Sequence, residues 1–333
     1  MFNIRYYAPK QVTNPLTLTI QQILTKYWGH TAFRPLQEDI IHSVMLGKDT
    51  LALLPTGGGK SICFQVPAMA MEGICIVISP LIALMKDQVE NLMRAGIPSV
   101  AVYSGMHSRE IDVTLDNCIY GNIKFIYLSP ERLGSEMVRI RIKKMKVSLF
   151  AVDEAHCISQ WGYDFRPSYL KIAEIKELHP NAAVIALTAT ATPEVVKDIQ
   201  QKLLFKSENL FQISFERKNL SYVVLEEDDK LKKLIKIINS VPGSGIVYAR
   251  NRKKTQEIAE LLRKHKITAD YYHAGLDHET RSAKQVAWTK NKIRVITATN
   301  AFGMGIDKPN VRFVIHLEPP DCLESYFQEA GRA

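Results

Sequence analysis

The stretch DEAHCISQWGYDFRPSY, at residues 153–169, directly follows the apolar run VSLFAV at residues 147–152. The length and composition of that run predict a buried strand of a parallel sheet. Asp153 and Glu154 would then lie at the carboxyl end of the strand, where open α/β sheets place their ligands. There Asp153 could hold a magnesium ion and Glu154 could orient or deprotonate a water molecule. Taken alone, such an acidic pair is more often a helix cap or a solvated turn, so its meaning depends on the rest of the chain.

The remainder of the stretch combines aromatic rings with cations. The side chains concerned are His156, Trp161, Tyr163, Phe165, Arg166 and Tyr169. Rings interleaved with a cation suit stacking on unpaired bases, because every base has a π-face and the nucleic-acid backbone is negatively charged. Aromatic residues near a strand end can instead belong to the core. In the functional interpretation, one segment joins two features: an acidic pair that binds a metal ion and a water molecule, and a loop that stacks on bases. A protein that couples ATP hydrolysis to nucleic acid needs such a connection.

The sequence PTGGGKS at residues 55–61 predicts a phosphate-binding loop, since it follows an expected strand and precedes a helical segment. Glycines let backbone N–H groups curl around phosphate oxygens, and the helix N-terminus adds its dipole. Lys60 would supply charge to the β and γ phosphates, and Ser61 would offer magnesium a hydroxyl beside Asp153. The nucleotide-binding residues expected here are Thr56, Gly57, Gly58, Gly59, Lys60 and Ser61. Leu54 stands where the usual pattern has its first glycine, and a glycine-rich turn with a solvated lysine is the alternative.

Composition and charge narrow the class of protein. A chain of 333 residues with 46% hydrophobic and 23% charged residues is typical of a soluble globular protein with two domains. The formal net charge of +9 favours a polyanionic partner without proving one. Five scattered cysteines without a C-x-x-C pair predict neither a zinc site nor disulfides. The first residues lack the apolar core of a signal peptide, and we expect a cytoplasmic protein, associated with the nucleoid if bacterial.

Short apolar runs alternate with helical segments along the chain, which predicts βαβ units and parallel sheets. A change of composition at residues 205–218 places a domain boundary at about residue 207. We therefore expect an extension at residues 1–16, a first domain at 17–207 and a second at 208–333. Strands are expected at residues 50–54, 74–78, 99–103, 124–128, 148–152 and 183–187, and then at 245–248, 268–272, 294–297 and 312–316.

Several motifs together resemble those of superfamily-two helicases: TGGGKS at 56–61, DEAH at 153–156, LTATAT at 187–192 and QEAGR at 328–332. More narrowly, FRPLQ at 33–37 and SQWGYDFRPSY at 159–169 resemble the RecQ family of DNA helicases. The resemblance runs from about residue 20 to Ala333 and implies two tandem RecA-like domains of the P-loop NTPase fold, with ATP and magnesium between them. The chain stops within the last motif, before a second arginine that the family carries, so the second domain is expected to be truncated.

The resemblance also implies roles for individual residues. Gln37 and Arg34 would recognise adenine, His30 would stack on the base in place of the usual tyrosine, and Asp307 would face the nucleotide. Gln328 would position the attacking water and Arg332 would act as a finger toward the γ-phosphate. The expected catalytic set is Lys60, Asp153, Glu154, Gln328 and Arg332.

Residues of other family motifs would contact DNA, partly through backbone amides that bind phosphate without reading sequence. The expected DNA-binding residues are Ser79, Lys86, Ser129, Arg132, His156, Trp161, Phe165, Arg166, Arg250, His273 and Thr297. Thr188, Ala189 and Thr190 would relay the nucleotide state toward them.

The chain is thus expected to be the core of an ATP-dependent DNA helicase, in which Mg-ATP hydrolysis drives translocation and duplex unwinding in DNA repair and recombination. Its partners would be single-stranded and partly duplex DNA, with no membrane, and it would act as a monomer. The 3′-to-5′ polarity follows from the resemblance alone. Two alternatives stay open: an RNA-directed helicase of the same superfamily, and a truncated fragment that binds nucleotide and DNA with little turnover.

Overall fold

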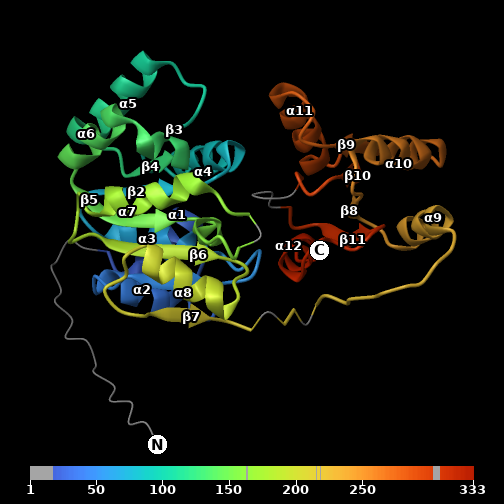
Figure 1. Cartoon of the computed structure of the whole chain (residues 1–333), viewed down its shortest axis with the longest axis horizontal. Helices are drawn as coiled ribbons and strands as arrows, with labels where there is room; N and C mark the ends of the chain where they lie inside the picture. Colours follow the sequence, from blue (N-terminus) through green and yellow to red (C-terminus); the bar gives the residue numbers. More distant parts are fainter. Residues whose placement is uncertain (1–17, 163, 215, 218, 303–307) are drawn as a thin grey trace, which may run out of the picture.

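The computed structural model describes residues 18–333 except Tyr163, Phe215, Lys218 and residues 303–307 (Figure 1). The expected extension at residues 1–16 and Asp307 lie outside these described residues. Two α/β domains follow one another along the chain, each with a parallel sheet flanked by helices, which confirms the predicted fold class. Within the part of the chain that is described, none of the helices combines the length and the apolar content needed to cross a bilayer.

The first domain is built on a sheet of seven parallel strands in the order β3-β4-β2-β5-β6-β1-β7. Its strands are β1 (Thr50–Leu53), β2 (Ile74–Ile78), β3 (Ser99–Val102), β4 (Phe125–Leu128), β5 (Val147–Val152), β6 (Ala183–Thr188) and β7 (Leu210–Gln212). The order places β6 between β5 and β1. Because the carboxyl ends of parallel strands share one edge of the sheet, the segments that follow β1, β5 and β6 meet there.

Helices cover both faces of this sheet (Figure 1). One face packs against α5 (Ser108–Tyr120), α6 (Glu136–Lys144), α7 (Lys171–Lys176) and α8 (Pro193–Lys202). The other packs against α2 (Gln37–Met45), α3 (Ile62–Ala70) and α4 (Ile82–Arg94), with α1 (Ile20–Trp28) resting on α2 and α3. In β2, alternate residues enter opposite cores: Ile74, Ile76 and Ile78 face one, and Cys75 and Val77 face the other. Burial on both faces is why these strands have continuous apolar sequences.

The second domain has a four-stranded parallel sheet in the order β11-β8-β10-β9. The strands are β8 (Ser244–Tyr248), β9 (Ala269–Tyr272), β10 (Val295–Ala298) and β11 (Val311–His316), and the helices are α9 (Lys230–Ser240), α10 (Arg252–Lys264), α11 (His278–Thr289) and α12 (Leu323–Ala330). Asp229, Asn251 and Asp277 begin α9, α10 and α11, because their side chains accept hydrogen bonds from backbone N–H groups of the first turn. The ten strands expected from the sequence are confirmed, with ends shifted by at most one residue.

The domain boundary expected at about residue 207 is too early. Leu210–Gln212 forms β7, which pairs in parallel with β1, so it belongs to the first sheet. The strand is only three residues long and lies at the sheet edge, with residues that are exposed or half-buried. It therefore lacks the apolar run by which the other strands can be recognised. The connection to the second domain starts after Gln212 and reaches α9.

A buried ion pair lies in the first domain, just before β1. Asp49 Oδ2 lies 2.9 Å from Lys176 Nζ on α7, and each residue is 5% exposed. Asp49 also accepts hydrogen bonds from the backbone N–H groups of Val184 (2.9 Å) and Lys206 (3.0 Å). The Lys176 ammonium donates further to the carbonyls of Leu203 (3.1 Å) and Leu204 (2.8 Å). The pair thus joins α7, β6 and the segment after α8, and its polar atoms are satisfied.

Candidate nucleotide and nucleic-acid site

The loop at residues 55–61 connects β1 to α3, as the phosphate-loop prediction requires. Gly57 and Gly59 have φ angles of +75° and +76°, a region that L side chains rarely adopt. Gly58 needs its small size, because a Cβ there would lie 2.8 Å from the Pro55 carbonyl oxygen. The three glycines therefore fit this loop for two separate reasons, conformation and space.

Arg34 and Gln37 contact the backbone of the phosphate loop. The Gln37 amide donates to the carbonyls of Gly58 (3.3 Å) and Gly59 (3.0 Å), and its oxygen accepts from the Arg34 backbone N–H (2.8 Å). The Arg34 guanidinium donates to the Gly57 carbonyl. Gln37 is 3% exposed, whereas His30 is exposed. In this structure the pair shapes the loop, and recognition of adenine by these residues stays a prediction.

A matched pair of substitutions tests the contact between Gln37 and the loop. A Cβ on Gly59 would lie 2.5 Å from Gln37 Nε2, whereas a Cβ on Gly57 would meet nothing within 4 Å. Both substitutions introduce the same positive-φ strain, so only Gly59→Ala should displace the amide. Since unmaking a buried hydrogen bond costs about 1–3 kcal/mol, we expect Gly59→Ala to weaken ATP binding by about 10-fold relative to Gly57→Ala. Titration with a fluorescent ATP analogue measures this ratio, and equal affinities would contradict the prediction.

Asp153 follows β5 and is held from several sides. Its Oδ1 accepts from the Glu154 backbone N–H (3.0 Å), its Oδ2 lies 3.5 Å from the Ser79 hydroxyl, and its carbonyl accepts from the Tyr169 hydroxyl (2.9 Å). Burial and the neighbouring Glu154 raise the pKa of Asp153 to about 7, against the opposing charge of Lys60. A cation at this carboxylate would favour its charged form. The carboxylate of Asp153 and the hydroxyl of Ser61 are hard oxygen donors of the kind that Mg²⁺ takes, so these residues fit the metal.

Glu154 has an unusual backbone conformation. Its φ and ψ angles are 47° and 48°, in the left-handed region that costs a non-glycine residue on the order of 1–3 kcal/mol. Its side chain is buried, with Oε2 3.4 Å from His156 Nδ1 and no hydrogen bond to that oxygen among the described residues. Strain of this kind persists where the surrounding structure imposes it, often at functional sites. The geometry is consistent with a carboxylate that acts on a water molecule.

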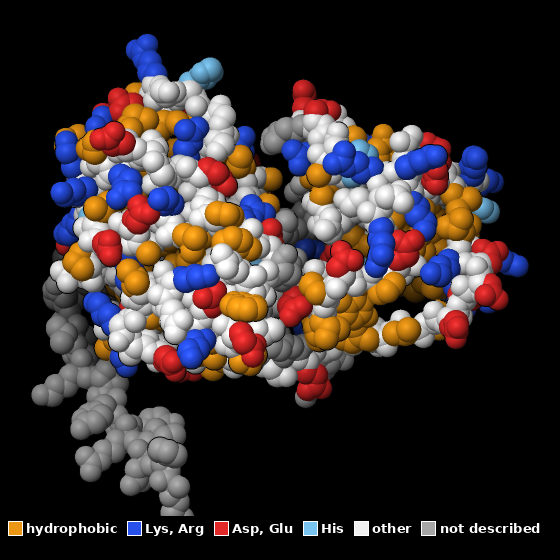
Figure 2. Space-filling model, viewed as in Figure 1, with side chains coloured by type: hydrophobic (Ala, Val, Ile, Leu, Met, Phe, Trp, Pro, Cys, Tyr) orange, Lys and Arg blue, Asp and Glu red, His pale blue; other side chains and the backbone are white. Residues whose placement is uncertain are grey.

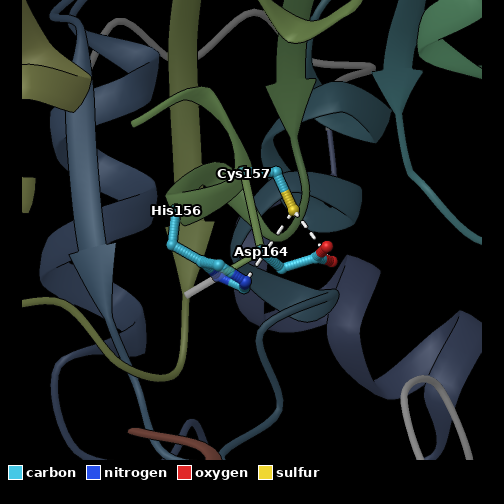
Figure 3. A group of neighbouring side chains, drawn as sticks. All are labelled: His156, Cys157 and Asp164. Atoms are coloured by element: carbon cyan, nitrogen blue, oxygen red, sulfur yellow. Dashed lines mark hydrogen bonds between the residues drawn. The ribbon is translucent and has the colours of Figure 1, made fainter. Parts of the chain in front are cut away.

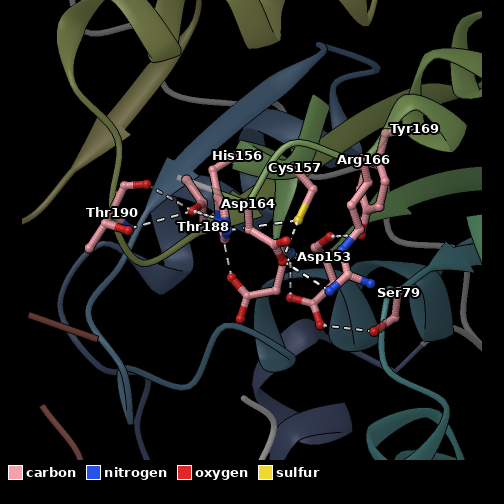
Figure 4. Close-up of polar contacts among 10 residues, drawn as sticks. Ser79, Asp153, His156, Cys157, Asp164, Arg166, Tyr169, Thr188 and Thr190 are labelled. Atoms are coloured by element: carbon pink, nitrogen blue, oxygen red, sulfur yellow. Dashed lines mark hydrogen bonds and ion pairs between the residues drawn. The ribbon is translucent and has the colours of Figure 1, made fainter. Parts of the chain in front are cut away.

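His156 connects the acidic pair to the end of β6 (Figure 4). Its Nδ1 lies 2.9 Å from the hydroxyl of Thr188, which donates in turn to the Thr190 carbonyl (3.1 Å). Because the one proton of Thr188 is directed to Thr190, we infer that Nδ1 carries a proton and donates to Thr188. Burial lowers the pKa of His156, which favours the neutral ring. The expectation that His156 contacts DNA is therefore wrong for this structure, since the side chain is 1% exposed and bonded inside the domain.

His156, Cys157 and Asp164 bring a nitrogen, a sulfur and a carboxylate oxygen within 4.8 Å of one another (Figure 3). Cys157 Sγ lies 3.7 Å from His156 Nε2 and 3.7 Å from Asp164 Oδ2. Burial raises the pKa of the Cys157 thiol, so the thiol keeps its proton. Arg166 donates to the same Asp164 oxygen through Nε (3.1 Å) and Nη2 (2.9 Å). A protonated thiol and a carboxylate occupied by Arg166 favour a hydrogen-bonded anchor over a metal site.

The same segment carries an exposed aromatic residue, whose backbone N–H donates to the Ser159 hydroxyl (3.2 Å). Trp161 is 78% exposed, whereas Tyr169 is fully buried and belongs to the core. Phe165 is half-buried beneath the Lys202 ammonium, 5.8 Å from the ring centre. Arg166, expected to contact DNA, donates to Asp164 and to the Pro80 carbonyl (3.1 Å), so it positions the loop. Among the described rings of this loop, Trp161 is the most exposed.

The QEAGR motif lies at the C-terminal end of α12, across from the phosphate loop. Gln328 is 8% exposed and lines a small pocket with Thr56 and Thr190 of the first domain. Arg332 lies beside Tyr248 of β8. Burial raises the pKa of Tyr248 to about 12, and the positive charge of Arg332 acts against this rise. The pocket thus brings Gln328 to Thr56, an expected nucleotide-binding residue, and to Thr190 of the expected relay. Arg217 and Tyr222 also line this pocket. Neither can be predicted from the sequence, because an isolated cation and ring in a connecting segment form no recognisable motif.

Comparisons with known proteins agree with this geometry. The family DEAD/DEAH box helicase matches residues 34–199, and Helicase conserved C-terminal domain matches residues 229–333. The chain is 42% identical over 96% of its length to ATP-dependent DNA helicase RecQ of Pasteurella multocida, and 45% identical over 94% to RecQ of Bacillus subtilis. The chain belongs to the RecQ family.

The match covers part of the relatives. The chain spans 51% of the P. multocida RecQ and 54% of the B. subtilis RecQ, about half of each relative. Among solved structures, Mycobacterium smegmatis helicase Lhr bound to ssDNA and AMP-PNP aligns with a TM-score of 0.73 at 20% identity, over 96% of this chain and 46% of that one. At this identity the likeness supports the two-domain fold alone.

Several residues expected from the RecQ resemblance to contact DNA are buried. Ser79, Ser129 and Thr297 are 2%, 1% and 0% exposed. The Thr297 hydroxyl donates to the Thr255 carbonyl (2.6 Å), and the backbone N–H groups of Ser79 and Ser129 donate to neighbouring strands. The side chains of these three residues are turned into the domains in this structure, and contact of their motifs with DNA stays a prediction.

The remaining RecQ motif residues differ in accessibility. Lys86 is exposed and lies 4.7 Å from the ring centre of Tyr103. Arg132 is half-buried and donates to the Tyr103 carbonyl (3.0 Å). Arg250 is exposed but lies 3.8 Å from Glu318 and 3.6 Å from Asp321. His273 is half-buried, and burial lowers its pKa. Lys86 and Arg250 are therefore the most accessible cations of the predicted set.

Proposed function

We propose that this chain is the ATP-hydrolysing core of a DNA helicase and couples hydrolysis of Mg-ATP to movement along single-stranded DNA. The observation that carries the proposal is the connection, within residues 153–169, of the acidic pair to an exposed tryptophan. Glu154 and His156 lie within 3.4 Å, His156 contacts Thr188, and Trp161 projects from the same segment. A change at the nucleotide would reach the DNA-facing loop through a few neighbouring groups of one segment.

The protein would contribute to catalysis mainly by positioning the reactants and stabilising charge, as in other phosphoryl transfers. Lys60 and Arg332 would stabilise the developing negative charge. Glu154 would accept a proton from the attacking water, and Gln328 would orient that water. Asp153 and Ser61 would hold magnesium, which when bound neutralises phosphate charge. Thr56, the loop glycines, Arg34, Gln37, His30 and Asp307 would bind the nucleotide.

On the DNA side, Trp161 and Phe165 would stack on bases, and Lys86, Arg132, Arg250 and His273 would contact the backbone. Binding of this kind tolerates any sequence, because stacking and phosphate contact are shared by all nucleotides. We further propose 3′-to-5′ translocation and duplex unwinding in DNA repair and recombination by a monomeric, cytoplasmic protein, associated with the nucleoid if bacterial. The membership of the chain in the RecQ family supports these finer assignments.

Trp161→Ala tests the coupling. We expect ATP hydrolysis without DNA to stay unchanged and the single-stranded DNA concentration that gives half-maximal stimulation to rise by about 10-fold. The reason is that stacking of one base on an aromatic ring is worth about 1–3 kcal/mol. The measurement is the magnesium-dependent ATPase rate against oligonucleotide concentration at low salt, where backbone contacts are strongest.

Tyr120→Ala is the matched control, since Tyr120 is 80% exposed on α5 and belongs to no expected site. A Trp161→Ala response that coincides with the control would remove the loop from the coupling mechanism. Stimulation of the unmodified chain by RNA as strongly as by DNA would favour the RNA-directed alternative. Nucleotide binding without stimulated turnover would favour the low-turnover alternative.

A further inference from the structure

Arg217, in the segment that connects the two domains, bonds to backbone carbonyls of both of them. Its Nη1 donates to the carbonyls of Thr56 (3.4 Å) and Gly331 (3.2 Å), and its Nη2 donates to the Ala333 carbonyl (3.1 Å). Thr56 belongs to the phosphate loop of the first domain, whereas Gly331 and Ala333 flank Arg332 in the second. We propose that Arg217 is a positioning residue that joins the phosphate loop to the end of α12 and thereby aligns Arg332 for ATP hydrolysis, an inference that rests on the proposed function.

The chemistry of these contacts suits arginine specifically. A guanidinium presents several donors in a fixed plane, so one side chain can bridge three carbonyls. The Gly331 carbonyl lies at the C-terminal end of α12, where helix carbonyls lack intrahelical partners and a cation is favourable. By bonding on both sides of Arg332, the guanidinium fixes the backbone from which that side chain extends.

A second contact from the same segment supports this alignment. The Tyr222 ring lies 5.9 Å from that of Tyr326 and 6.2 Å from that of Phe327, both on α12. Hydrophobic side chains gather over α12 and the connecting segment beside it (Figure 2). Tyr222 therefore packs on the body of the helix while Arg217 bonds to its end. Arg217 and Gln328 line the same pocket, so the contact lies at the expected reaction site.

The kinetic test compares Arg217→Gln, Arg217→Lys, Arg332→Ala and the double variant Arg217→Gln/Arg332→Ala. Since an arginine finger contributes on the order of 10³–10⁵ in rate, misalignment by Arg217→Gln should lower kcat by about 10- to 100-fold. The KM for ATP should change by less than about 3-fold, because the contacts that bind ATP equally in the ground state and the transition state are kept. Arg217→Lys keeps the charge without the planar donors and should recover only part of kcat.

The double variant separates alignment from direct contact with phosphate. If Arg217 acts through Arg332, adding Arg217→Gln to Arg332→Ala should lower kcat no further. Multiplication of the two losses would mean that Arg217 acts independently and would overturn the inference. Arg312→Gln is the matched control, since Arg312 of β11 also donates to backbone carbonyls, those of Pro309 (3.2 Å) and Val311 (3.0 Å).

Hydrogen exchange provides a readout that does not depend on turnover. In the chain without nucleotide, Arg217→Gln should speed amide exchange in both residues 54–62 and residues 323–333, whereas Arg312→Gln should not. Unchanged exchange at both segments would overturn the inference even if the unmodified chain proved unable to hydrolyse ATP. Faster exchange in a chain without any ATPase activity would uphold the contact and refute the proposed function instead.

Discussion

Replacing Glu154 with Gln is expected to lower kcat for ATP hydrolysis by about 10²–10⁴-fold, the range that a positioned general base contributes. Gln has nearly the same shape as Glu and can occupy the same buried position, but its amide cannot accept the proton of the attacking water. The loop residues and Asp153 are unchanged, so nucleotide affinity should change little. Stopped-flow single-turnover kinetics and titration with a fluorescent ATP analogue measure the two quantities separately.

Glu90→Gln is the matched control for this substitution. Glu90 lies on α4 in an exposed ion pair with Arg94, and pairs of this kind contribute little to stability. Its kcat should equal that of the unmodified chain. If Glu154→Gln retained more than about one tenth of the activity, a general-base role would be untenable, since such bases supply at least about 10²-fold. A parallel loss of nucleotide affinity would instead indicate that Glu154 shapes the binding site.

Replacing Asp49 with Ala should destabilise the first domain by about 3–5 kcal/mol, the typical cost of removing one partner of a buried ion pair. The substitution leaves the Lys176 ammonium in a site where the side chain is 6% exposed. It also removes the acceptor for the backbone N–H groups of Val184 and Lys206. Urea unfolding followed by circular dichroism measures the loss, fitted with two transitions because two domains need not unfold together.

Asp112→Ala provides the comparison for a more exposed pair. Asp112 contacts Arg141 at 2.6 Å with its side chain 46% exposed, so its removal should cost less than about 1 kcal/mol. Adding Lys176→Met to Asp49→Ala should restore part of the lost stability, because the unpaired charge is then gone. Equal losses for Asp49→Ala and Asp112→Ala would show that burial of the first pair does not determine its contribution.

The sequence predicts the fold well because parallel strands buried on both faces have continuous apolar sequences, as in β2 and β5. The phosphate loop is equally recognisable, since the requirements at Gly57, Gly58 and Gly59 are local to the loop. β7 cannot be predicted in this way, because an edge strand of three residues buries too little apolar surface to require a hydrophobic sequence pattern.

Motif membership predicts the place of a residue in the fold better than its orientation. Thr297 lies at the strand end where the sequence puts it, but its hydroxyl bonds inside the domain. His156 lies directly after the acidic pair, yet it is turned toward Thr188. The contacts of Arg217 depend on how the two domains meet, which no local pattern encodes.

The pairing of β7 with β1 fixes where the chain leaves the first domain. Leu53 and Gln212 are direct neighbours in the sheet, and adjacent strands lie about 4.7–4.9 Å apart. β1 continues into the phosphate loop and β7 continues into the connecting segment, so both begin at the same point of the sheet edge. We therefore expect a displacement of the phosphate loop to reach the start of the connecting segment directly, through the hydrogen bonds that pair β1 with β7.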